Sequence, residues 1–95
     1  MQLSTSSNHV TINGNIKSVS DFGDIKTCLD DIKTQHNEII IDIVDSLSMT
    51  SSVIGYFNKL VLKDRVNLTL RVGNPQLMDL LDDLKLSSTF KARKV

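Results

Sequence analysis

The sequence predicts an α/β domain with a mixed sheet of four to five strands and three to four helices. Segments that alternate apolar and polar residues, as strands do, take turns with segments whose apolar residues recur every three to four positions, as in helices. This alternation favours parallel strand pairs joined by helical crossovers. A length of 95 residues suits one hydrophobic core, so we expect residues 1–95 to form a single domain.

The first part of the chain is expected to form a strand pair followed by a helix. His9–Ile16 alternates apolar and polar residues and predicts a strand, with Gln2–Thr5 as its short partner strand. From Val19 onward, apolar residues are spaced by three and four and mark one face of a helix. Ser18, with Asp21 three residues later, is a variant of the capping box that starts helices.

The middle of the chain predicts a buried strand and a second helix. Ile39–Val44 is too short for a helix and nearly continuous in apolar residues, so we expect a central strand covered on both faces. Asp42 near its end is expected to accept hydrogen bonds from the following loop. Ser51–Lys63 carries apolar residues at helical spacing, and either Thr50 or Ser51 is available as its N-cap.

The last part predicts one more strand and one more helix. Val66–Val72 alternates strictly, which is typical of a strand with one buried face. Gly73–Pro75 provides a turn, an N-cap and a proline suited to the first helical position, and Leu77–Leu84 continues as a helix. The expected core residues are Val10, Ile12, Phe22, Ile25, Leu29, Ile39, Ile41, Ile43, Ile54, Phe57, Leu68, Leu70, Leu77 and Leu81.

Charge and composition narrow the classes of function. Eleven basic and eleven acidic residues balance, so we expect no broad cationic surface for nucleic acid or anionic lipid. The basic tail, with Lys91, Arg93 and Lys94, is expected to be a solvated chain end. A lone cysteine, Cys28, and the lack of a segment typical of secretory signals favour a reducing, cytoplasmic location. No apolar run approaches about 18 residues, so no membrane insertion is expected.

No catalytic or metal-binding pattern stands out. His9 and His36 lie in different predicted elements, with no further ligand at metal-binding spacing. No nucleophile, base and orienting group can be assembled, and no glycine-rich phosphate loop is present. We therefore expect a binding protein that uses no metal or cofactor, and not an enzyme.

Several short motifs occur together in a characteristic order. Ile39–Asp42 is an apolar strand ending in aspartate, and Thr50–Gly55 opens a helix eight residues after that aspartate. Gly14–Ile16 forms a glycine turn after an earlier strand, and Leu68–Asn74 forms a later strand with its exit. In this order and spacing, the chain from about Gly14 to Phe90 resembles the STAS domain family of anti-sigma-factor antagonists. The family's signature is an Asp-ended strand followed by Asp-Ser-Ser-Gly or a variant.

The resemblance implies a protein-binding regulator. In many members the serine matching Ser51 is phosphorylated by a partner anti-sigma kinase and dephosphorylated by a PPM-type phosphatase, and the unmodified form binds the kinase and frees a sigma factor. Ser52 is a second, weaker phosphorylation candidate. The partner, an anti-sigma factor or serine kinase-like protein, would contact Gly14, Asn15, Lys17, Thr50, Ser51, Ser52 and Val53.

Three departures from the family pattern leave two interpretations open. Lys17 and Thr50 stand where acidic residues are usual, and Val53 stands where glycine is usual. One interpretation is a phosphorylation switch at Ser51, with Lys17 pairing with the phosphate or with an acidic partner group. The other is a STAS subunit that docks constitutively on another protein, such as a lipid-transporter ATPase, with Thr50 or Ser51 acting only as a helix cap.

Overall fold

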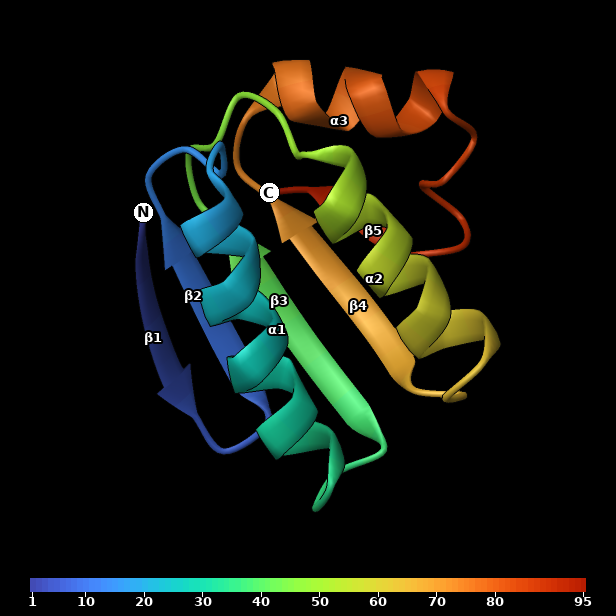
Figure 1. Cartoon of the computed structure of the whole chain (residues 1–95). Helices are drawn as coiled ribbons and strands as arrows, with labels where there is room; N and C mark the ends of the chain where they lie inside the picture. The colour runs from blue at the N-terminus through green and yellow to red at the C-terminus, as the bar shows by residue number, and fades with distance from the viewer.

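The computed structural model describes residues 1–95, and its strands and helices alternate along the chain (Figure 1). The elements are β1 (Gln2–Ser6), β2 (His9–Asn13), α1 (Val19–Lys33), β3 (Glu38–Ile43), α2 (Ser51–Leu62), β4 (Asn67–Val72), α3 (Pro75–Asp83) and β5 (Ala92–Lys94). One sheet runs in the order β1-β2-β3-β4-β5, and only the β1–β2 pair is antiparallel. The expected α/β class, with a mixed sheet of four to five strands and three to four helices, is confirmed.

The helix starts follow the local sequence signals. Ser18 has an extended backbone and accepts a hydrogen bond from the Asp21 N–H, while the Asp21 carboxylate accepts one in return, so the predicted capping box is present. Thr50, not Ser51, is the N-cap of α2. In α3, Asn74 caps the helix and Pro75 takes the first helical position, where a missing N–H costs nothing.

All three helices cover the same face of the sheet. From β2 to β5 each crossover steps in the same direction across the sheet, and such crossovers are nearly always right-handed. Figure 1 shows α1 and α2 side by side in front of the strands. The strand residues that share this face are all buried: Val10, Ile12, Ile39, Ile41, Ile43, Leu68, Leu70 and Val72. Leu77 and Leu81 of α3 belong to the same 21-residue cluster.

The opposite face of the sheet is not covered by any helix, so the expectation that β3 is covered on both faces is wrong. Burial alternates along β3, and Ile40 and Asp42 on the open face are only half-buried. Asp42 does not accept hydrogen bonds from the following loop, contrary to the expectation. Its carboxylate pairs instead with His9 of β2 and with Arg71 of β4, whose Nε lies 3.3 Å from Asp42 Oδ1. The apolar run could not reveal which faces the crossovers would cover.

The basic tail also differs from the expectation. Ala92–Lys94 pairs in parallel with β4 as the edge strand β5, so the backbone of the tail belongs to the sheet. The side chains of Arg93 and Lys94 remain exposed, as expected for charged groups. A three-residue strand is too short to show a period in the sequence.

The core follows the prediction with two exceptions. Phe22 and Ile54 are half-buried at its margin, and the other expected core residues are buried. Ile16, Met49 and Phe90 are buried although they lie outside the regular elements, where no periodicity marks them. None of the three helices is long and apolar enough to cross a membrane.

Candidate functional site

The two segments that the sequence motifs single out meet at one end of the sheet. β2 and β3 are parallel neighbours, so their carboxyl ends lie at the same edge, and the Val44 N–H donates to the Ile12 carbonyl (3.0 Å). The loop of residues 14–18 leaves β2 and the loop of residues 44–50 leaves β3. The first loop leads into α1 and the second leads into α2.

Reciprocal hydrogen bonds clamp these loops together. The Gly14 N–H donates to Asp45 Oδ1 (2.7 Å) from the first loop to the second. In the other direction, the Leu47 N–H donates to Asn15 Oδ1 (3.0 Å). Because each loop supplies both a donor and an acceptor, neither can shift without breaking bonds to the other.

Ser46 completes the clamp from the interior. It is a fully buried polar residue, and its Oγ accepts from the Ile16 N–H (3.0 Å) and donates to the Ser48 carbonyl (2.7 Å). These two bonds satisfy the hydroxyl, as burial requires. Asp45 and Ser46 were not singled out from the sequence, although aspartate and serine after a strand commonly hydrogen-bond loop backbone.

Two glycines permit the close approach of backbone at this end of the sheet. Gly14 has a φ of +90°, which side-chain-bearing residues rarely adopt, and a Cβ on it would lie 3.1 Å from the Met1 Cα. Gly73, at the exit of β4, donates its N–H to the Ile43 carbonyl (2.8 Å). A Cβ on Gly73 would lie 2.0 Å from the Val44 carbonyl oxygen.

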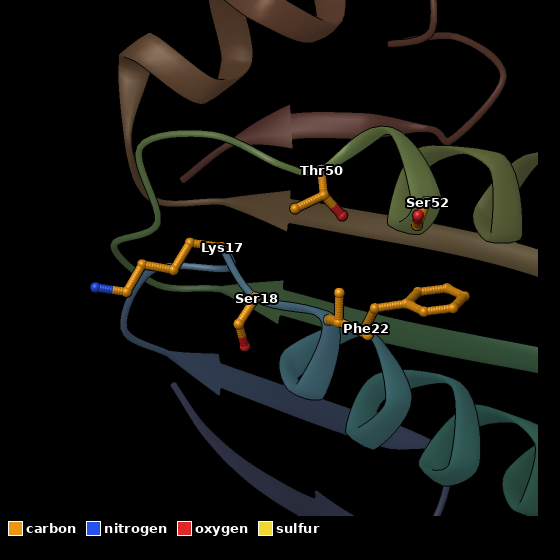
Figure 2. Close-up of a pocket in the computed structure, with 6 residues that line it drawn as sticks. Lys17, Ser18, Phe22, Thr50 and Ser52 are labelled. Atoms are coloured by element: carbon orange, nitrogen blue, oxygen red, sulfur yellow. The ribbon is translucent and has the colours of Figure 1, made fainter.

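The starts of α1 and α2 flank a shallow pocket of about 130 Å³, drawn in Figure 2. The cap Ser18 and Phe22 of α1 line one side, and the cap Thr50 and Ser52 of α2 line the other. Lys17 lies at its rim, and Figure 2 shows its side chain running away from Thr50 and Ser52. The pocket therefore has one aromatic wall and several hydroxyl groups.

Ser51 and Ser52 occupy the first two positions of α2, and both are exposed. Thr50 performs the capping, since its side chain accepts from the Val53 N–H (3.3 Å). The Ser51 hydroxyl makes no hydrogen bond within the chain and is free to react or to contact a partner. Val53 is fully buried, so its side chain is not part of the exposed surface.

The electrostatics of the two helix starts differ. At α1, the backbone N–H groups of Lys17 and Ser18 donate to the Asp21 carboxylate and lower the pKa of that group. At α2, the first turn contains no acidic side chain. The partial positive charge at the start of α2 is therefore uncompensated from within the helix.

Comparisons of the chain with protein-family models, with curated proteins and with solved structures found no match.

The residues expected to contact a partner are brought together by the fold. Asn15 and Lys17 are exposed on the first loop, and Ser51 and Ser52 are exposed at the helix start beside it. Gly14 is half-buried and offers backbone only. These four exposed residues, with the half-buried Thr50 between them, form the candidate surface, which we call the loop–helix surface: Asn15, Lys17, Thr50, Ser51 and Ser52.

Other groups with chemical potential lie elsewhere. His9 is engaged with Asp42 on the open sheet face, and no group of three or more His, Cys, Asp or Glu side chains is placed to hold a metal ion. Cys28 is half-buried in α1, and burial, followed by the charge of Asp31, raises the pKa of its thiol. A raised pKa keeps the thiol protonated and poorly nucleophilic.

Proposed function

We propose that this domain is a STAS-like regulatory module whose loop–helix surface binds a protein partner, and that phosphorylation of Ser51 switches the binding. The observation that carries the proposal is the position of Ser51, exposed at the first residue of α2 with a free hydroxyl. The glycine turn that the resemblance assigns to the same partner surface is hydrogen-bonded to the loop that leads into this helix start, through Asp45 and Asn15.

The chemistry of the switch follows from this position. The Ser51 Oγ would attack the γ-phosphorus of ATP held by a partner kinase, losing its proton to a kinase base as ADP leaves. A phosphate carries a charge of about −1.5 to −2, and a helix N-terminus stabilises a nearby anion by about 0.3–1 kcal/mol. The first turn of α2 holds no acid to repel it. The domain would stay folded while the added charge and bulk block the docked partner.

The partner class comes from the family resemblance. An anti-sigma factor or serine kinase-like protein would bind the unmodified surface, and a PPM-type phosphatase would restore it by hydrolysing the phosphoserine. In this proposal the module acts in the cytoplasm of a bacterium and controls transcription through the availability of a sigma factor. It carries no catalytic group of its own.

A second candidate function is a STAS subunit that docks constitutively, for example on a lipid-transporter ATPase. One observation favours it: Thr50, directly before Ser51, and Lys17, in the neighbouring loop, stand where acidic residues are usual in the family, and the Thr50 hydroxyl already serves as the helix cap. In this case the same surface binds its partner without covalent control.

Phosphosite mapping together with affinity capture separates the two functions. The tagged chain is expressed in its native cells, and captured proteins and phosphopeptides are identified by mass spectrometry. The switch predicts phosphate on Ser51 and capture of an anti-sigma factor or serine kinase. An unphosphorylated Ser51 with a transporter ATPase as the captured protein would support constitutive docking and contradict the switch.

A further inference from the structure

The outer edge of β1 carries none of the features that usually prevent strands from pairing with other molecules. Figure 1 shows β1 at the margin of the sheet with nothing beyond it. Its five residues, Gln2–Ser6, include no charged residue and no proline, and four of the five are exposed. Natural edge strands are commonly protected by lysine, proline, bulges or short length.

The other edge of the same sheet provides a direct contrast. β5 has only three residues, and two of them are the exposed cations Arg93 and Lys94. A second cationic edge would be repelled by β5, whereas β1 presents no charge to repel a copy of itself. The molecule thus protects one edge and leaves the other open.

The hydrogen-bonding pattern shows which groups of β1 face outward. The carbonyl of Asn8, just before β2, accepts from the Ile40 N–H, and the carbonyl of Ile12 in β2 accepts from the Val44 N–H, so the backbone groups of the even-numbered residues face β3. The odd-numbered residues of β2 must then face β1, and the register pairs them with the even-numbered residues of β1. Leu3 and Thr5 therefore direct their N–H and C=O groups away from the sheet.

We propose that β1 pairs with β1 of a second copy of this chain, antiparallel about a twofold axis at Ser4. In this register Leu3 lies opposite Thr5 of the second copy and exchanges hydrogen bonds with it in both directions. Ser4 lies opposite Ser4 of the second copy, with no charge between them. The two sheets become one sheet that is continuous across the dimer.

The edge chemistry favours a second copy because a twofold contact must be complementary to itself. The outward Leu3 and Thr5 are placed symmetrically about Ser4, so one register satisfies both copies. Every side chain of the strand is neutral. The contact is confined to one short strand and lies below the roughly 1,200 Å² typical of stable interfaces, so we expect a reversible dimer at high protein concentration.

Disulfide cross-linking tests the register. In a Cys28→Ser background, Ser4→Cys places two thiols on directly opposed residues, whose Cα separation of about 4.5–5.5 Å is compatible with a disulfide. Gln2→Cys is the matched control, because its symmetry mate lies about 14 Å along the strand. With oxidised glutathione, we expect a cross-linked dimer from Ser4→Cys and little from Gln2→Cys. When the separate Gln2→Cys and Ser6→Cys variants are mixed, we expect a cross-linked dimer with one chain of each. Cross-linking of Ser4→Cys no greater than that of Gln2→Cys would overturn the proposal.

Sedimentation provides a measurement without a new thiol. The mass of the wild-type chain should rise from 10.6 kDa toward twice that value with concentration. Ser4→Lys should weaken dimerisation at least about tenfold, because like charges would then face each other across the axis. Ser88→Lys, at an exposed serine after α3, should leave it unchanged. A wild-type chain that stays monomeric at every concentration, or a Ser4→Lys variant that dimerises like wild type, would also contradict the proposal.

Discussion

At the residue scale, Ser46 determines the stability of the clamp between the two loops of the candidate site. It is fully buried, and its Oγ bonds both the Ile16 N–H and the Ser48 carbonyl. Ser46→Ala should lower the free energy of unfolding by about 1–3 kcal/mol, because a buried N–H loses its acceptor. Urea unfolding measures the loss, with the exposed Ser88→Ala as control. A loss below about 0.5 kcal/mol would show that the Ser46 bonds do not hold the loops.

Two glycines should respond oppositely to the same substitution. A Cβ on Gly73 would lie 2.0 Å from the Val44 carbonyl oxygen, so Gly73→Ala should destabilise the fold by about 1–3 kcal/mol. Gly55 lies inside α2, and a Cβ there meets no atom within 4 Å. Gly55→Ala should therefore stabilise the fold by about 0.5–1 kcal/mol through helix propensity. Thermal melts of both variants check the pair, and equal effects would argue against the close approach of β4 to the end of β3.

Side-chain hydrogen bonds could be predicted from the sequence only where both partners lie close together in the chain. The Ser18 capping box was predictable because its bonds join residues three apart. The role of Asp42 was not predictable, because its partners His9 and Arg71 come from two other strands. Ser51 could be placed at a helix start, but only the backbone geometry distinguishes Thr50 as the cap.

At the element scale, a cluster of side chains joins α1 to α2. The Tyr56 hydroxyl of α2 donates to the Asp30 carboxylate of α1, and Lys26 donates to the same group (2.6 Å). Just beyond the end of α2, Asp64 binds Lys33 of α1 (2.9 Å). The hydrogen bonds from Lys26 and then Tyr56 hold the pKa of Asp30 well below its usual range, despite partial burial.

This depressed pKa predicts a pH dependence of stability. The ordinary pKa of an aspartate is about 3.9, and between the lower folded pKa of Asp30 and this ordinary pKa the unfolded chain binds more protons than the folded chain. The stabilisation by the Asp30 carboxylate is therefore present above the ordinary pKa and is lost as pH falls below it. At about pH 7, Asp30→Asn should cost up to about 1 kcal/mol, since the pairs are partly exposed. The cost should shrink between about pH 5 and about pH 3. Denaturant unfolding at about pH 5 and about pH 3 measures this change, with the exposed Asp31→Asn as control. A cost of Asp30→Asn that is the same at both pH values would show that the carboxylate pairing is unimportant.

At the scale of the whole molecule, the common direction of the crossovers determines which face of the sheet the helices cover and which face stays open. Helices cover one face, and the other face presents a polar row in register across all five strands: Ser4, Thr11, Asp42, Arg71 and Arg93. The winding also brings the ends of β2 and β3 together, so that residues 14–18 meet residues 44–50. The loop–helix surface is a product of topology.

Local sequence signals therefore predicted where the helices and strands lie better than they predicted which residues and sheet faces are covered by other parts of the chain. Periodicity placed the helices and most of the core, since each signal lies within one element. It could not place Phe90, which lies outside any helix or strand and packs edge-on against Phe57 with ring centroids 5.8 Å apart. It also could not show that Ile40 faces an open side, because that depends on the order of the strands.

The central claim is that Ser51 controls partner binding at the loop–helix surface. The most direct measurement is the dissociation constant of the captured partner for wild type, Ser51→Ala, Ser51→Asp and the control Ser88→Asp. Ser51→Ala and Ser88→Asp should bind within about twofold of wild type, and Ser51→Asp should bind at least about tenfold more weakly, equivalent to about 1.4 kcal/mol. Circular dichroism should show all four folded, since a carboxylate is favourable at a helix N-terminus. Equal dissociation constants for all four forms would contradict the account.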